Sequence, residues 1–166
     1  LQIADYVREG SEILVQVDKD PIGDKGARLS ANITIAGRLL ILVANSPGVA
    51  LSRRIEDESE RARLTAIVER ILADNTGELI QGTGFILRTA AIGMGDAELK
   101  DDALRLSQVW RAIREKRVWA SAPTQLHTDL GPIERALRDG GVRLLKYRPE
   151  VAPWQFRKNR LRRLHR

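Results

Sequence analysis

The start of the chain alternates apolar and polar residues in the two-residue period of β-strands. In residues 11–20, SEILVQVDKD, the side chains of Ile13, Val15 and Val17 fall on one face of an extended chain. Residues 27–37, ARLSANITIAG, alternate in the same way, and a proline and two glycines lie between the two segments. The pattern predicts a hairpin. Two strands alone are marginally stable in water, so we expect this hairpin to belong to a larger unit.

Three further segments predict strands. Residues 38–44, RLLILVA, form a continuous apolar run rich in branched residues, which is typical of a buried strand. After a turn at NSPG, residues 49–56, VALSRRIE, predict another strand that ends in charged residues. Residues 84–88, GFILR, predict a strand that leads into a turn broken by glycines.

Two longer segments change to the three- and four-residue period of amphipathic helices. The first, residues 57–77, offers Asp57 or Ser59 as a cap and has acids in its first turn, where the helix dipole favours them. The second, residues 95–119, repeats apolar residues at helical spacing: Leu99, Ala103, Leu106, Trp110 and Ile113. Residues 121–132 then predict a short strand and a turn, and residues 133–147 predict a short helix followed by a strand.

This order of elements predicts an α+β fold rather than a doubly wound parallel sheet. The 166 residues suffice for one ordinary domain or two very small ones. Hydrophobic residues make up 43% of the chain and aromatic residues 4%, so we expect a core that is mostly aliphatic.

Composition excludes several classes of site. Without cysteine, the chain can form neither a disulfide framework nor a thiolate metal site, and its two histidines argue against a multi-histidine cage. No apolar run reaches the roughly 18–20 residues that a membrane span needs, and the N-terminus has neither a signal-peptide pattern nor an initiating Met. We therefore expect no membrane span, a cytoplasmic setting, and a chain that is an excerpt or a processed product.

The net charge of +6 is concentrated at the C-terminal end. Residues 151–166 hold six of the 28 Lys and Arg residues and no acid, so the other 22 basic residues balance the 22 acidic ones. An anion site in residues 1–150 must therefore be built locally. The tail combines its bases with Trp154 and Phe156, which predicts binding of single-stranded nucleic acid. One alternative is a disordered tail with nonspecific affinity for polyanions, and another is a tail that does not belong to the parent fold.

Arg88 and Thr89 are the first candidate binding residues, because they stand where a strand ends before a helix. A guanidinium offers a fork of donors, and a threonine adds a hydroxyl and a backbone N–H. Gly93 and Gly95 would let the backbone approach an anion closely at this helix N-terminus. The alternative, which local spacing favours, is that Arg88 pairs with a surface acid and Thr89 merely ends the strand.

Two other basic positions are candidates. Arg53 and Arg54 are adjacent, so on a strand they point to opposite faces, and one of them could face a ligand. The alternative is a solvated charge run. Lys25 lies in the hairpin loop PIGDKGARLS, which does not match a P-loop but could still place this ammonium on a phosphate. A solvated lysine is an equally good interpretation.

Acidic residues and histidine give weaker candidates for catalysis. His127 precedes Asp129 by two residues, but no nucleophile is fixed near this pair, so we expect a structural polar role. Asp101 and Asp102 are adjacent in the second helix and cannot face one site together, so we predict that they lie on its solvated face.

Several segments in order resemble the ribonuclease E/G family of bacterial endoribonucleases. They are REGSEILVQVDKDPIGDKGARLSANITIAGRLLILV, SPGVALSRRIEDESER, GTGFILRTAA and, more weakly, SAPTQLHTDLGPIERALRD, at near family spacing over residues 6–147. The resemblance implies that residues 1–37 are the last part of an S1 domain, an OB-type RNA-binding barrel. It implies a 5′-sensor domain over residues 38–120 and part of a ribonuclease-H-like domain over residues 121–148. Residues 149–166, the basic tail, resemble no part of the family.

The resemblance also implies roles for five residues. Arg88 and Thr89 fall on the family's phosphate-binding pair, and Ile41 falls at the apolar position that meets the terminal nucleotide. Arg53 falls on a basic position near the RNA path, and Lys25 on the S1 lysine that touches RNA. A monophosphate would fit such a pocket better than a larger, more charged triphosphate end.

The activity that the resemblance implies is magnesium-dependent cleavage of single-stranded RNA in rRNA and mRNA processing. The family's magnesium-binding aspartates, and the cysteine pair that shares zinc between subunits of its homo-oligomers, lie beyond the end of this chain. We therefore expect no catalytic residue or metal here, and single-stranded RNA with a 5′-monophosphate as the partner. Three alternatives stay open: retained nuclease activity, a remnant that does not fold stably, and binding through the basic tail alone.

Overall fold

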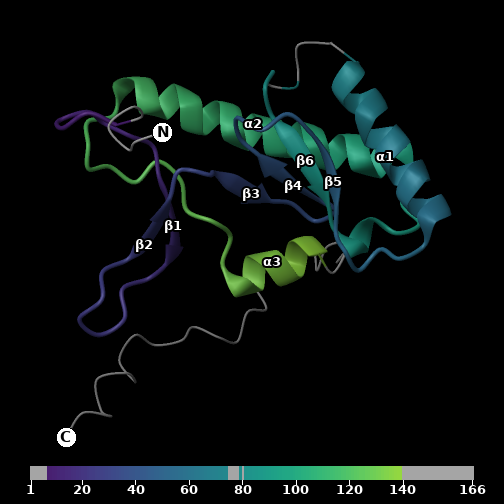
Figure 1. Ribbon diagram of the computed structural model, residues 1–166, viewed down its shortest axis with the longest axis horizontal. Helices are drawn as coiled ribbons and strands as arrows, with labels where there is room; N and C mark the ends of the chain where they lie inside the picture. The colour runs from purple at the N-terminus through teal and green to yellow at the C-terminus, as the bar shows by residue number, and fades with distance from the viewer. Residues whose placement is uncertain (1–6, 75–78, 80, 140–166) are drawn as a thin grey trace, which may run out of the picture. The chain divides into compact units, whose positions relative to one another are not determined.

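The computed structural model describes residues 7–74, 79 and 81–139, which form an α+β fold (Figure 1). The chain divides into two units, residues 1–129 and residues 130–166. In the second unit the described element is helix α3, Pro132–Asp139. The predicted strand after this helix and the basic tail lie outside the described residues.

The first unit contains two sheets. Strands β1 (Gln16–Lys19) and β2 (Arg28–Ser30) pair as an antiparallel two-stranded sheet. The second sheet has the strand order β3-β4-β6-β5, and its strands are β3 Thr34–Ala36, β4 Leu40–Val43, β5 Gly48–Leu51 and β6 Gly84–Leu87. Neighbouring strands are antiparallel except β5 and β6, which run parallel.

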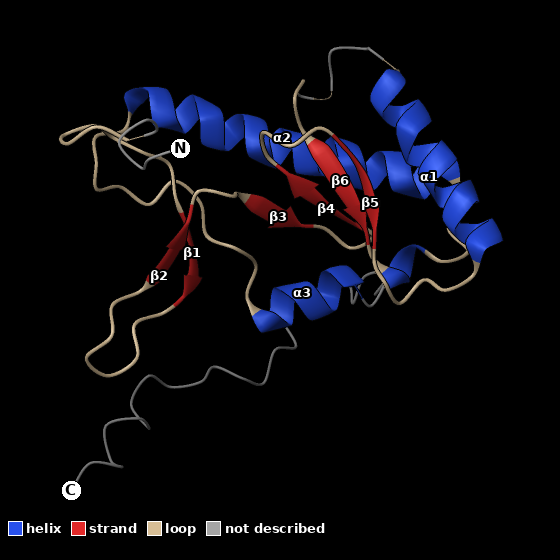
Figure 2. Cartoon of the chain, viewed as in Figure 1, coloured by secondary structure: helices blue, strands red, loops and turns tan. Residues whose placement is uncertain are grey.

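Two long helices cover one face of the four-stranded sheet (Figure 2). Helix α2, Asp96–Trp119, packs on β3 and β4, and helix α1, Glu58–Ala73, packs on β5 and on α2. Asp57 caps α1 by accepting hydrogen bonds from the N–H groups of Ser59 and Glu60, as its position before the apolar stripe predicts.

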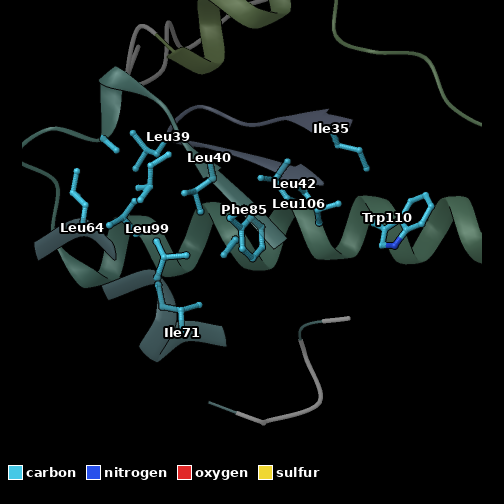
Figure 3. Close-up of a cluster of buried hydrophobic side chains, with 14 of the residues drawn as sticks. Ile35, Leu39, Leu40, Leu42, Leu64, Ile71, Phe85, Leu99, Leu106 and Trp110 are labelled. Atoms are coloured by element: carbon cyan, nitrogen blue, oxygen red, sulfur yellow. The ribbon is translucent and has the colours of Figure 1, made fainter. Parts of the chain in front are cut away.

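The core lies between this face of the sheet and the helices. Alternation along the strands directs one set of side chains inward, and Figure 3 shows them meeting residues from both helices. The buried residues from the strands are Ile35, Leu40, Leu42, Phe85 and Leu87, and those from the helices are Leu64, Ile71, Leu99, Leu106 and Trp110. The core is mainly aliphatic, as the composition predicts.

The opposite face of the sheet is only half-buried. Paired residues at its centre are Ile41 and Ile86, with Ala36 and Ala50 beside them on the outer strands. Ile41, Ile86 and Ala36 are partly exposed and Ala50 is exposed. The sheet therefore has a helix-covered face and a face on which these side chains reach the surface.

Three strand predictions differ from the structure, one of them at Arg53, because β5 ends at Leu51. The strand predicted over residues 27–37 is divided into β2 and β3, and β3 pairs with β4 instead of continuing the hairpin. Asn32 lies at the break, where its N–H bonds to the Ser30 hydroxyl and the chain bends. The strand predicted within residues 121–132 is wrong, because residues 121–131 take no strand conformation.

Within the part of the chain that the structure describes, no helix is both long enough and apolar enough to span a membrane. The longest, α2, has charged residues along its whole length and is amphipathic.

Candidate functional site

Arg88 follows directly after β6 and keeps the extended conformation of the strand, with φ −87° and ψ 161°. Its backbone N–H donates to the Leu39 carbonyl at 2.9 Å, which extends the pairing of β6 with β4 by one residue. Because side chains alternate along a strand, Arg88 points to the same side of the sheet as Ile86. The candidate phosphate-binding arginine thus lies at the end of the half-buried face.

The guanidinium of Arg88 is held by main-chain carbonyls. Its Nη1 donates to the Gly37 carbonyl and, at 3.2 Å, to the Arg38 carbonyl. Both carbonyls belong to the turn between β3 and β4. The alternative interpretation predicted a surface acid as the partner of Arg88, and the contacts that the structure gives this side chain are carbonyls instead.

The same turn is held from its other side by Asp102 of α2. The Asp102 carboxylate accepts from the N–H groups of Leu39 at 2.8 Å, Leu40 at 3.0 Å and Arg38 at 3.3 Å. Asp102 is 3% exposed and is also paired with Arg105 of the next helical turn. The prediction that Asp102 lies on a solvated face is therefore wrong, because its position follows the buried stripe of the helix.

Gly37 makes this arrangement possible by its lack of a side chain. A Cβ at this position would lie 2.8 Å from the Leu40 carbonyl oxygen, 2.9 Å from a methyl carbon of Leu106, and closer still to the Asp102 carboxylate. Real Cβ atoms avoid such contacts, so any larger residue would have to displace the turn or the helix.

Thr89 is exposed and begins η2, the single 3₁₀ turn Thr89–Ala91 that leads toward α2. The Thr89 carbonyl accepts from the Ile92 N–H at 3.2 Å, which closes the turn. Gly93 follows with a φ of 75°, a left-handed conformation that favours glycine. Thr89 therefore follows Arg88 at the start of a tightly turned loop, with its side chain exposed.

That loop is attached to α1 through Glu60 and Arg63. Glu60 accepts from the Gly93 N–H at 2.8 Å and pairs with Arg63 through two hydrogen bonds of 2.7 Å. Arg63 also donates to the Met94 carbonyl at 3.0 Å. The hydrogen bonds from Arg63, and after them the one from Gly93, lower the pKa of Glu60 from 4.5 to about 2.

Ile41 and Arg53 lie near Arg88 by strand register. Ile41 pairs directly with Ile86, two residues before Arg88, on the half-buried face. Arg53 is exposed in a turn just after β5. Because β5 runs parallel to β6, the C-terminal ends of both strands lie at the same end of the sheet. The Ser52 N–H donates to the Leu87 carbonyl at 2.8 Å and keeps this alignment. The prediction that Arg53 lies on a strand is wrong, since the strand ends at Leu51.

Lys25 lies in the hairpin loop of the other sheet. It is exposed in the loop between β1 and β2, where its backbone bonds reciprocally with Ile22 at 3.1 Å in each direction. The structure thus places Arg88, Thr89 and Arg53 at one end of the four-stranded sheet. Ile41 lies further along the half-buried face, and Lys25 lies in a separate hairpin.

Comparison with known proteins assigns a family to this chain. A model of the Ribonuclease E/G family matches residues 34–143, a range that begins with β3 and contains Gly37, Arg88 and Asp102. The chain belongs to the ribonuclease E/G family.

Curated ribonuclease E/G relatives extend beyond this chain. Ribonuclease G of Escherichia coli (strain K12) is 44% identical over 137 residues, which are 82% of this chain and 27% of that protein. Ribonuclease G of Haemophilus influenzae is 41% identical over 137 residues, and Ribonuclease E of Nostoc is 39% identical over 137 residues, covering 82% of this chain and 26% and 19% of those proteins. The chain therefore spans about a quarter of the ribonuclease G relatives and a fifth of that ribonuclease E.

A solved protein of a different name gives a much weaker likeness. The RNase P protein from Thermotoga maritima overlaps with 46% of this chain and 82% of its own, at a TM-score of 0.40 and 12% identity. A likeness at this level supports no statement about this ribonuclease E/G region.

His127 and Asp129 lie apart from the Arg88 site. His127 is exposed and lines a groove of about 950 Å³ between β1 and the segment that follows α2. Arg117 and Glu12 also line this groove. In the residues that the structure describes, no three His, Asp or Glu side chains gather where they could hold a metal ion.

The sequence patterns did not predict that Gly37 and Asp102 shape the turn that holds Arg88 in this ribonuclease E/G region. Helical spacing could have found Asp102, because it lies between Leu99 and Leu106 on the apolar stripe of α2. A buried carboxylate on such a stripe must have partners, and backbone N–H groups at a turn are suitable ones. Gly37 carries no comparable signal in the sequence. The need for a residue without a side chain at this position comes partly from Asp102, which lies on a helix and is 65 residues further on.

Proposed function

We propose that this chain is the RNA-binding, 5′-monophosphate-sensing segment of a ribonuclease E/G type endoribonuclease that acts in rRNA and mRNA processing. The observation that carries the proposal is the Arg88 guanidinium, fixed by the Gly37 and Arg38 carbonyls beside the exposed Thr89. Both carbonyl contacts use Nη1. The Nε and Nη2 hydrogens of Arg88 then bind the terminal phosphate oxygens of the RNA.

Thr89, Ile41 and Arg53 complete the proposed site. Thr89 adds its hydroxyl to the phosphate, and Ile41 provides an apolar surface for the terminal nucleotide on the face that Arg88 shares. Arg53, exposed at the same edge of the sheet, attracts the following phosphates of the strand. Lys25 would contact RNA from the hairpin, outside the phosphate site.

The charge of the chain supports a local site rather than general polyanion affinity. Six of the chain's 28 Lys and Arg residues lie in residues 151–166, and the remaining 22 are balanced by the 22 Asp and Glu residues. A uniform positive field therefore does not favour RNA over residues 1–150. Recognition has to come from directed donors such as those of Arg88.

The full-length protein is proposed to supply what this chain does not. Magnesium-dependent cleavage belongs to the catalytic part of full-length relatives, which are expected to be cytoplasmic homo-oligomers that share zinc between subunits. The proposal assigns binding, and no cleavage, to the residues of this chain.

Paired RNAs test the proposal directly. One single-stranded RNA is prepared with a 5′-monophosphate and with a 5′-hydroxyl, and the dissociation constants are measured by fluorescence anisotropy. Losing charge-assisted hydrogen bonds of about 1.5–3 kcal/mol corresponds to a preference of roughly 10- to 100-fold for the monophosphate. Arg88→Ala should remove the preference, and Arg88→Lys should keep only part of it because an ammonium lacks the fork. Equal binding of both RNAs by the unaltered chain would contradict the proposal.

Deleting residues 151–166 separates the site from the tail. If the tail binds RNA by charge alone, the deletion lowers affinity for both RNAs by the same factor and leaves their ratio unchanged. If the deletion abolishes all binding and the ratio of the intact chain is already one, the tail is the binding element. Incubation with labelled RNA and magnesium tests retained nuclease activity, and intact RNA would exclude it.

A further inference from the structure

We propose that Asp102 is a positioning residue for Arg88 and so sets the preference for a 5′-monophosphate without touching RNA. This inference rests on the proposed function, since it assigns to Asp102 the control of the same site. The two side chains come from different elements, Arg88 from the end of β6 and Asp102 from α2. They act on one another through the turn between β3 and β4.

Three consecutive peptide groups connect the two residues. In the group between Gly37 and Arg38, the carbonyl accepts from the Arg88 guanidinium and the N–H donates to Asp102. In the next group the Arg38 carbonyl accepts from the guanidinium and the Leu39 N–H donates to Asp102.

The third peptide group repeats the pattern with the backbone of Arg88. Its Leu39 carbonyl accepts from the Arg88 N–H at 2.9 Å, and its Leu40 N–H donates to Asp102 at 3.0 Å. Each of these three peptide groups therefore has Asp102 on its N–H side and Arg88 on its carbonyl side. Hydrogen bonds that share a peptide group polarise one another, so the negative carboxylate strengthens the carbonyls as acceptors for Arg88.

The consequence for binding is preorganisation. A free arginine side chain loses much rotamer freedom when it grips a phosphate. Here Nη1 is already fixed by two carbonyls whose orientation depends on Asp102, so less freedom remains to be lost when the anion arrives. Removing the carboxylate should leave the turn, and with it the guanidinium, less well oriented.

Arg105 holds the carboxylate in place from the solvent side. It pairs with Asp102 Oδ1 at the i,i+3 spacing, and its side chain is 44% exposed whereas that of Asp102 is 4% exposed. Asp102 Oδ2 remains directed at Leu39 and Leu40. A series of hydrogen bonds thus connects Arg105 to Asp102, Asp102 to the turn, and the turn to Arg88. Arg105 is the solvent-accessible end of this series.

A purely structural role for Asp102 is the alternative. In that case its loss lowers the unfolding temperature and weakens binding of all RNAs alike. The positioning role predicts a selective effect, in which binding of the 5′-monophosphate RNA falls and binding of the 5′-hydroxyl RNA does not. The ratio of the two dissociation constants separates these outcomes.

The test compares Asp102→Asn with Asp101→Asn in the full chain. Asp101 is the adjacent, exposed residue, so its variant controls for loss of one negative charge on α2. We expect Asp102→Asn to lower affinity for the 5′-monophosphate RNA about tenfold, to leave the 5′-hydroxyl RNA within about twofold, and to remain folded by circular dichroism. Asp101→Asn should leave the ratio unchanged.

Arg105→Ala keeps the test usable if Asp102→Asn does not fold. This variant retains the carboxylate and removes its exposed partner, so a smaller decrease of the ratio is expected, and Arg114→Ala on the same helix is the charge control. Exchange of the Arg88 Nη1 hydrogens, which the carbonyls hold, with solvent provides a second readout by NMR without RNA. It should be faster in either Asp102→Asn or Arg105→Ala.

The outcomes are distinct for the two proposals. A ratio of one in the unaltered chain overturns the proposed function and this inference together. The inference alone is overturned if the unaltered chain shows a clear preference and the variants Asp102→Asn and Arg105→Ala keep both the same ratio and the same exchange of the Arg88 Nη1 hydrogens. A reduced ratio with faster exchange supports it.

Discussion

The Glu60 carboxylate accepts a hydrogen bond of 2.8 Å from the Gly93 N–H, across 33 residues of sequence. It joins the first turn of α1 to the loop that follows Thr89. Arg63 strengthens the connection, because it pairs with Glu60 and donates to the Met94 carbonyl. The loop on which Thr89 stands is therefore anchored at its far end by a charged pair.

This contact predicts that stability decreases in acid through Glu60. Its pKa is lowered from 4.5 to about 2, chiefly by the hydrogen bonds from Arg63. A lowered pKa in the folded state stabilises the fold above the pKa of the unfolded chain, and the contribution is lost as pH falls from about 4.5 toward 2. Thermal unfolding of Glu60→Gln should thus show a lower midpoint at pH 7, with a much smaller difference from the unaltered chain at pH 2.5.

Glu58→Gln is the matched control for this experiment. Glu58 lies in the same helical turn, but its side chain is 90% exposed and its nearest charged partner, Arg61, is 3.6 Å away. Its unfolding midpoint should stay close to that of the unaltered chain at every pH. If Glu60→Gln differs from the unaltered chain equally at pH 2.5 and pH 7, the ionised carboxylate is not the cause.

Gly37→Ala should damage both the fold and the proposed phosphate preference. The new methyl group would contact the Leu40 carbonyl at 2.8 Å and the Asp102 carboxylate more closely still, so the turn that orients Arg88 must move. We expect the free energy of unfolding to fall by about 1–3 kcal/mol, as for overpacked cores, and the preference for 5′-monophosphate RNA to decrease.

Gly26→Ala gives the comparison for Gly37→Ala. No atom lies within 4 Å of the Cβ that it would add, and a chemical denaturation curve should place its midpoint within error of the unaltered chain. A Gly37→Ala protein with normal stability and an unchanged RNA ratio would show that the close approach of Asp102 is unimportant.

The fold was largely predictable where one physical signal dominated. Strong helical periodicity over residues 57–77 and 95–119 corresponds to α1 and α2, and β4 and β6 follow apolar runs of the expected length. The division of residues 27–37 was not predictable from alternation, because a period of two does not say which partner strand each half will choose.

The candidate site was predictable only in part. Local spacing left Arg88 ambiguous between an anion site and a surface pair, and the resemblance to ribonuclease E/G sequences decided the interpretation. The contacts around it depend on Gly37 and Arg38, which are 50 or more residues before Arg88 in the sequence. They also depend on Asp102, which lies on helix α2. Adjacency of two aspartates suggested a solvated face, whereas the helical stripe buries the second of them.

The two faces of the sheet predict losses of stability of different size on truncation. Leu42 is fully buried against the helices and Val43, its neighbour in β4, is partly exposed on the other face. Leu42→Ala should lower the free energy of unfolding by about 2–5 kcal/mol, and Val43→Ala by less than about 1 kcal/mol. Urea denaturation of the two variants measures this, and equal losses would contradict the assignment of the faces.

Arg53 should contribute to RNA binding in a different way from Arg88. It is exposed at the edge of the sheet, so under the proposed function it contacts a phosphate within the strand rather than the terminal one. Arg53→Ala should then weaken the binding of 5′-monophosphate RNA and of 5′-hydroxyl RNA by the same factor. It should also reduce the slope of the logarithm of the association constant against the logarithm of the salt concentration by about 0.7, which is the counterion release of one phosphate contact on a single strand.

Titrations at four salt concentrations measure the slope, with Arg54→Ala as the adjacent exposed control. A change in the ratio of the two RNAs, with no change in slope, would instead place Arg53 in the terminal phosphate site.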